Sequence, residues 1–150
     1  MGMTRPFFIA LLAASVSAAW AAGPVDPVNK SWRGVALQGY DAVAYFTANK
    51  PMKGSDAFAH EWMGAKWYFA SDANRKLFIS SPEKYAPQFG GYCAWAVSNN
   101  YTANADPEAW KIVDGKLYLN YNQDVQKKWA EEVYKRIEAG NKNWPGLRKQ

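Results

Sequence analysis

The feature that most constrains the fold is Asp114-Gly115, a dipeptide that separates two short runs of alternating apolar residues. Asp-Gly between such runs is the strongest short-range signal of a two-residue β-hairpin. Met63-Gly64 separates two further runs in the same way, with the glycine supplying a positive φ. The sequence therefore predicts two antiparallel hairpins, over residues 57–70 and 110–119.

Helix-start signals follow both hairpins. Ser71 and Asn122 each offer a side-chain oxygen to the free N–H groups of a helix, and Pro82 suits the first turn of another. The longest helix is expected from Asn122 to about residue 139, with Gly140 as its stop and an apolar stripe at every fourth residue: Val125, Trp129, Val133 and Ile137. We therefore predict an α+β fold, a small antiparallel sheet built from hairpins, packed against short helices and one longer C-terminal amphipathic helix.

Two short apolar runs have less distinct patterns. Residues 42–46 predict either a strand or a single helical turn. Residues 92–97 predict a strand, on which Cys93 and Trp95 share one face because side chains alternate across a strand.

The N-terminal segment is typical of a secretory signal peptide. Arg5 precedes a largely apolar run over residues 7–16, and Ala19-Trp20-Ala21 places small residues at a cleavage site. The run is shorter than the roughly 20 residues that span a bilayer, although an uncleaved membrane anchor is the alternative. We expect a cleaved leader over residues 1–21, an N-terminal arm over 22–34 and a single domain over 35–150, exported to the periplasm or secreted.

Composition excludes several classes of function. One cysteine excludes a disulfide scaffold, a four-cysteine zinc ribbon and a CxxC redox motif, and one histidine excludes a multi-histidine metal site. The basic excess is modest and is concentrated on the predicted C-terminal helix and tail. Nucleic-acid binding is not expected, because it calls for a denser basic stripe with exposed aromatic residues. No segment after the leader is long and apolar enough to span a membrane.

One stretch of the chain resembles a known family. The string from Gly64 to Ser71, GAKWYFAS, with Phe78, Pro82 and Tyr85 at their spacings, is similar to the YHS domain. The strings GYDAVAYF, GGYCAWAV and DGKLYLNYN are similar to an exported bacterial branch of such proteins, and the resemblance covers roughly residues 35–146. YHS domains accompany copper pumps and other heavy-metal proteins, so the resemblance implies metal binding through cysteines.

This chain departs from the family at its cysteines. The two cysteines near the strand-to-helix turn correspond to Ala70 and Asn74, and the stretch that would hold a third is residues 41–44, Asp-Ala-Val-Ala. The thiolate site that the resemblance implies is therefore not carried over, although the fold can be inherited without it.

Cys93 and His60 are the remaining candidate metal ligands. A thiolate and an imidazole suit copper first and zinc less, since a closed structural zinc site needs four ligands. Met52, Met63 or Asp41 would complete the set, and a methionine would favour copper. The alternative for Cys93 is a small buried apolar residue or a redox thiol, and for His60 a surface or orienting residue.

The leading hypothesis is thus an exported YHS-like binding module that handles copper, with a metal ion or another exported protein as partner. The alternative is a module that binds an apolar or flat ligand, or a protein, through an aromatic pocket, with the metal site degenerated. The candidate pocket residues are Trp62, Trp67, Tyr68, Trp95 and Tyr101, for which a core of large rings is the preferred interpretation. A third interpretation is an enzyme with Cys93 as nucleophile and His60 as base, oriented by Asp41 or Asn99. We consider an enzyme less favoured than a binding module.

Overall fold

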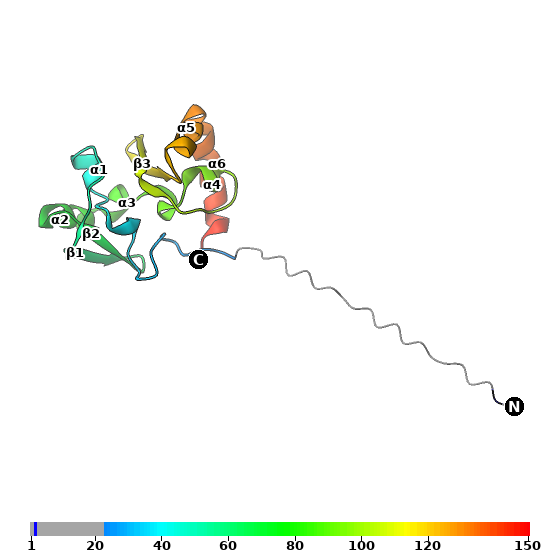
Figure 1. Ribbon diagram of the computed structural model, residues 1–150, viewed down its shortest axis with the longest axis horizontal. Coiled ribbons are helices and arrows are strands. Elements are labelled where there is room, and N and C mark those ends of the chain that lie inside the picture. Colours follow the sequence, from blue (N-terminus) through cyan, green and yellow to red (C-terminus); the bar gives the residue numbers. More distant parts are fainter. Residues whose placement is uncertain (1, 3–22) are drawn as a thin grey trace.

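The computed structural model describes residue 2 and residues 23–150, so the predicted leader lies outside the described residues apart from Gly2 (Figure 1). The α+β fold class is confirmed. The elements in chain order are η1 (Leu37–Gly39), α1 (Ala44–Thr47), β1 (Ser55–Trp62), β2 (Ala65–Phe69), α2 (Asp72–Ser80), α3 (Pro82–Tyr85), η2 (Gln88–Gly91), α4 (Ala94–Ser98), β3 (Asp106–Val113), β4 (Lys116–Asn120), α5 (Gln123–Glu131) and α6 (Val133–Leu147).

Both predicted hairpins are present, as two separate two-stranded sheets: β1 pairs with β2 and β3 pairs with β4, each antiparallel. Asp114 and Gly115 have φ values of 50° and 75°, and Met63 and Gly64 have 52° and 72°. Positive φ at both central residues is the geometry that matches the twist of the flanking strands. The turn residues therefore set the register of both hairpins.

Two helix starts also follow from local chemistry. The Ser71 side chain accepts a hydrogen bond from the Asn74 N–H at the start of α2, and the Asn122 side chain accepts one from the Val125 N–H at the start of α5. Each bond satisfies a backbone donor that has no partner within its helix. The run over residues 42–46 adopts the helical alternative, as α1.

The prediction of a strand over residues 92–97 was wrong. This segment enters α4, a short helix in which all residues except Trp95 are buried. A short apolar run buried on every side carries no period that separates a strand from a helix. The predicted common face of Cys93 and Trp95 is lost with the strand, since Cys93 is the N-cap of α4 and is buried, whereas Trp95 is half-buried.

The C-terminal helix also differs from its prediction. It breaks at Glu132 into α5 and α6, and it continues through Gly140 to Leu147. Gly140 is not a stop but a point of close packing, because a Cβ there would lie 2.6 Å from Cζ of the Phe89 ring. The absence of a side chain at Gly140 therefore lets α6 pack directly against the Phe89 ring.

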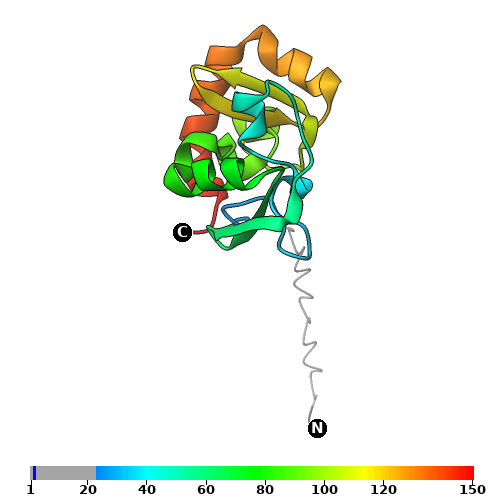
Figure 2. The same cartoon turned by 90° about the vertical axis from the view of Figure 1, so that its left-hand side faces the viewer.

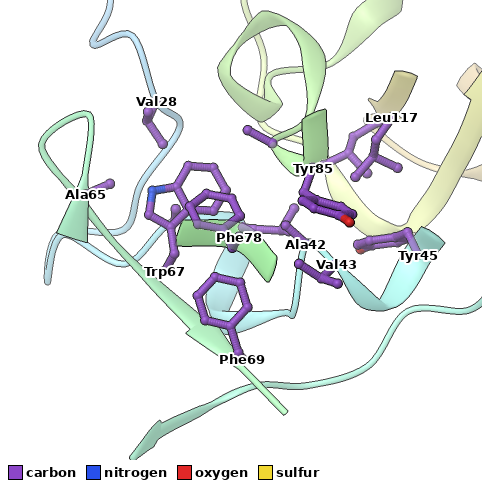
Figure 3. Close-up of a cluster of buried hydrophobic side chains, with 14 of the residues drawn as sticks. Val28, Ala42, Val43, Tyr45, Ala65, Trp67, Phe69, Phe78, Tyr85 and Leu117 are labelled. Carbon is purple, nitrogen blue, oxygen red and sulfur yellow. The ribbon is translucent and has the colours of Figure 1, made fainter. Parts of the chain in front are cut away.

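Two clusters of buried side chains form the core. In the first, the rings of Trp67 and Phe69 each pack 5.0 Å from that of Phe78, centroid to centroid (Figure 3). The second joins Phe89, Tyr118 and Trp129 beneath α6. Figure 2 shows α6 running along one side of the molecule toward the end that carries hairpin β1–β2.

Candidate functional site

The structure does not bring the two predicted metal ligands together. His60 lies on β1, opposite Trp67 of β2, and its ring packs edge-on against Phe78. Cys93 lies at the start of α4, and Figure 1 shows α4 and β1 on opposite sides of the molecule. Over the described part of the chain, no group of three or more His, Cys, Asp or Glu side chains is placed to hold a metal ion.

The Cys93 thiol is enclosed by its own hydrogen bonds. It is 1% exposed, its Sγ accepts a bond from the Tyr121 N–H at 3.2 Å, and it donates to Asn120 Oδ1 at 3.6 Å. Burial raises the pKa of this thiol, against a smaller lowering by nearby backbone N–H groups, of which that of Ala96 contributes most. Thiol reactivity requires exposure and a lowered pKa, so the geometry gives Cys93 a structural role.

We expect Cys93 to react roughly 100-fold more slowly with a thiol-specific disulfide reagent in the folded protein at pH 8 than in urea, because reaction must wait for opening of the fold. Stopped-flow absorbance measures both rates. Equal rates in the folded protein and in urea would contradict this account.

The raised pKa of the Cys93 thiol in the folded protein also makes stability depend on pH. The stability that this thiol contributes is present below its unfolded pKa of about 8.5 and is lost as the pH rises through the folded pKa.

An aromatic cleft lies where hairpin β1–β2, the N-terminal arm and the end of α6 meet. Its volume is about 360 Å³, within the usual range for small-molecule sites. Its walls carry four aromatic side chains together with prolines and Met63; the aromatic residues are Trp62, Trp67, Phe89 and Trp144. Cys93 and His60 are not part of this lining.

Two charged side chains also line the cleft, Glu83 from α3 and Arg148 just after α6. Arg148 is half-buried and Glu83 is exposed. Within residues 23–150, neither forms an ion pair. A half-buried guanidinium without an acidic partner is a ready donor to a carboxylate, sulfonate or phosphate group.

One of the two runs of three residues with positive φ in the described residues borders this cleft, and the other is Leu37–Gly39. Phe89, Gly90 and Gly91 have successive φ values of 56°, 63° and 82°. A bulky residue such as Phe89 rarely adopts this region, and such strain persists only where surrounding contacts hold it. The holding contacts are a hydrogen bond from Asn29 N–H to the Gly90 carbonyl at 2.8 Å and the packing of the Phe89 ring against Gly140.

Sequence reasoning identified part of the cleft. Of the five proposed pocket residues, Trp62 and Trp67 line it. The other three lie elsewhere: Trp95 stacks on Arg136 at 3.9 Å, Tyr101 borders a different hollow of about 490 Å³ beside Pro24, and Tyr68 belongs to neither lining.

The residues that sequence reasoning missed, Phe89, Trp144 and Arg148, come from segments far from the hairpin in sequence. The one signal in the sequence that could have pointed to them is Trp144-Pro145, a large aromatic residue in the C-terminal tail.

Comparisons with known proteins add no relative to these observations. No family model matches the chain, and no curated protein or solved structure does so either. Among the helices of the described residues, none has the length and apolar character needed to cross a bilayer.

Proposed function

We propose that this chain is an exported binding module that takes a small, flat, largely apolar ligand with an anionic group into the aromatic cleft. The observation that carries the proposal is the combination of aromatic walls from Trp62, Phe89 and Trp144 with the half-buried Arg148. Large rigid rings give contact area to a flat ligand at low cost in conformational entropy. Export is inferred from the leader pattern over residues 1–21.

The aromatic walls and Arg148 have different roles in binding the ligand. Trp62 and Trp144 are half-buried, so each keeps part of its ring surface available to a ligand. Trp67 is buried and donates its indole N–H to the Trp62 carbonyl at 3.0 Å, which fixes the hairpin side of the cleft. Ligand sites typically combine such apolar walls with a few polar groups that fix orientation, which is the role we assign to Arg148.

The copper hypothesis through Cys93 and His60 stays a prediction, and no contact in the described residues favours it. Under the YHS resemblance, thiols would stand at Ala70, at Asn74 and within residues 41–44. In this chain the Asp41 carboxylate accepts hydrogen bonds from the Ala70 N–H at 2.9 Å and the Asn74 side-chain amide at 2.8 Å. A hydrogen-bonded carboxylate thus takes the place that the resemblance gives to a thiolate cluster, which favours the non-metal alternative.

Titration with anilinonaphthalene sulfonate, a flat aromatic anion whose fluorescence rises in apolar surroundings, tests the cleft. We expect saturable binding at one site, weakened about tenfold, or about 1.4 kcal/mol, by Arg148→Gln through loss of one charge-assisted hydrogen bond. Trp144→Leu is expected to weaken binding by a similar factor. The matched controls are Lys149→Gln, which removes the neighbouring cation, and Trp32→Leu, which removes another tryptophan; both positions lie outside the lining.

Thermal unfolding of each variant must show a single cooperative transition, because this dye also binds partly unfolded states. Absent binding, or binding that the cleft variants and the controls affect equally, would contradict the proposed function.

A further inference from the structure

Two loop tips lie side by side at one end of the molecule and form what we call the paired-loop face, residues 30–34 and 61–66. Backbone hydrogen bonds join them: Lys66 N–H donates to the Gly34 carbonyl at 2.8 Å, and Ala36 N–H donates to the Lys66 carbonyl at 2.9 Å. The Lys30 ammonium adds a third link, to the Gly64 carbonyl at 2.9 Å. The face is therefore a fixed surface rather than two independent loops.

The most exposed large apolar side chain of the described residues lies on this face. Trp32 is 89% exposed and belongs to neither core cluster. Met63, at the neighbouring hairpin tip, is 49% exposed. The Trp32 turn is closed by the bond from Ser31 N–H to the Val35 carbonyl at 2.9 Å, so the indole is held outward on a rigid support. Because the Trp32 side chain is exposed, it contributes almost no buried apolar surface to the stability of the fold.

Basic side chains surround the exposed indole. The Arg33 guanidinium lies 4.8 Å from the centre of the Trp32 ring, and Lys30 and Lys66 stand on the same two loops. The acidic groups nearby are Asp26, which is already paired with Lys30 and Lys149, and Glu61, which is the cross-strand neighbour of Lys66. The face therefore has a net positive charge.

This combination is suited to the surface of an anionic bilayer. Indole rings favour the boundary between headgroups and acyl chains, and lysine and arginine side chains near the surface are attracted to anionic lipids. A hollow of about 290 Å³ between the tips, lined by Gly34, Glu61, Met63 and Lys66 among others, gives room for a headgroup. Protruding tips suit insertion into a soft interface better than the broad contact of about 800 Å² per partner that a stable protein complex needs.

We propose that the paired-loop face docks the protein on an anionic phospholipid bilayer, with Trp32 and Met63 entering the interface and Arg33 and Lys66 contacting phosphate groups. This docking does not depend on the proposed ligand of the cleft. Met63 borders both surfaces, so the tests below use Trp32 and Arg33, which line no part of the cleft.

Co-sedimentation with vesicles tests the proposal. Residues 23–150 hold both core clusters of the described part of the chain and correspond to the protein expected after cleavage of the leader, so this piece is used. Its use also removes the apolar leader as a separate source of lipid binding. Vesicles of equal parts phosphatidylglycerol and phosphatidylcholine are compared with vesicles of phosphatidylcholine alone. We expect at least tenfold stronger binding to the anionic vesicles, reduced by added salt.

Trp32→Ser and Arg33→Gln are each expected to weaken binding to anionic vesicles at least threefold while leaving the dye titration of the cleft unchanged. The matched controls are Tyr134→Ser and Lys135→Gln, exposed residues of α6 away from this face, which are expected to bind as the unchanged protein does. Absent sedimentation, equal binding to neutral vesicles, or losses shared by the control variants would each overturn the proposal.

Discussion

Asp41→Ala is expected to lower the free energy of unfolding by about 4 kcal/mol, because it removes one carboxylate that serves four buried or half-buried donors. Asp41 is 0% exposed. Its Oδ1 accepts from the N–H groups of Val43 at 2.8 Å and Ala44 at 3.1 Å, and its Oδ2 accepts from Ala70 N–H and from Asn74 Nδ2. The residue thereby ties α1 to the turn between β2 and α2.

Asp41→Asn separates the role of charge from that of size. An asparagine keeps one acceptor oxygen but turns an NH₂ group toward donors, so we expect a loss of at least about 2 kcal/mol. Asp56→Ala, at an exposed position of β1, is the matched control and is expected to change stability by less than about 0.5 kcal/mol. Urea unfolding followed by circular dichroism measures all three. An Asp41→Ala protein as stable as the control would contradict this role.

Gly90→Ala is expected to cost about 3 kcal/mol of stability and to abolish dye binding in the cleft. A Cβ on Gly90 would lie 2.0 Å from the Pro27 carbonyl oxygen and 2.9 Å from its carbon, and both are backbone atoms of the arm. Neither can move without displacing residues that line the cleft, since Pro27, Val28 and Gly90 all do so. The arm is expected to detach from η2.

Gly115→Ala isolates the contribution of backbone conformation. Gly115 has a φ of +75°, close to the +63° of Gly90, but no atom lies within 4 Å of its Cβ position. We expect it to cost only about 1 kcal/mol and to leave dye binding intact. Thermal unfolding and the dye titration, run on both variants, separate the two effects. Equal losses of stability in Gly90→Ala and Gly115→Ala would mean that the positive φ alone, rather than contact with the arm, requires a glycine at position 90.

The elements that could be predicted from the sequence are those fixed by a few neighbouring residues. Asp114-Gly115 and Met63-Gly64 determine two hairpins, because the backbone of the turn itself sets the direction of the strands. Ser71 and Asn122 determine two helix starts, because the capping bond joins residues three apart.

The predictions that failed depended on contacts between distant segments. The segment over residues 92–97, which enters a helix, is buried on nearly every side, so its apolar residues show no period that separates a helix from a strand. The sequence pattern predicts Gly140 to be a helix stop. In the structure its lack of a side chain makes room for the ring of Phe89, which lies more than 50 positions earlier in the chain.

The candidate site shows the same division. Trp62 and Trp67 were found because they share one hairpin with an unusual density of rings. Trp144 and Arg148 were not found, because their place in the cleft depends on the path of α6 along the molecule. The pairing of Cys93 with His60 rested on their being the only thiol and imidazole in the chain, a fact of composition that carries no information on distance.

The most direct test of the cleft is nuclear magnetic resonance of the indole N–H groups during titration with anilinonaphthalene sulfonate. We expect the signals of Trp62 and Trp144, which line the cleft and are half-buried, to shift in proportion to occupancy. The signals of Trp32, on the paired-loop face, and Trp129, deep in the second core cluster, are expected to stay in place. Shifts confined to Trp32, or no shift at a saturating dye concentration, would contradict the assignment of the cleft as the binding site.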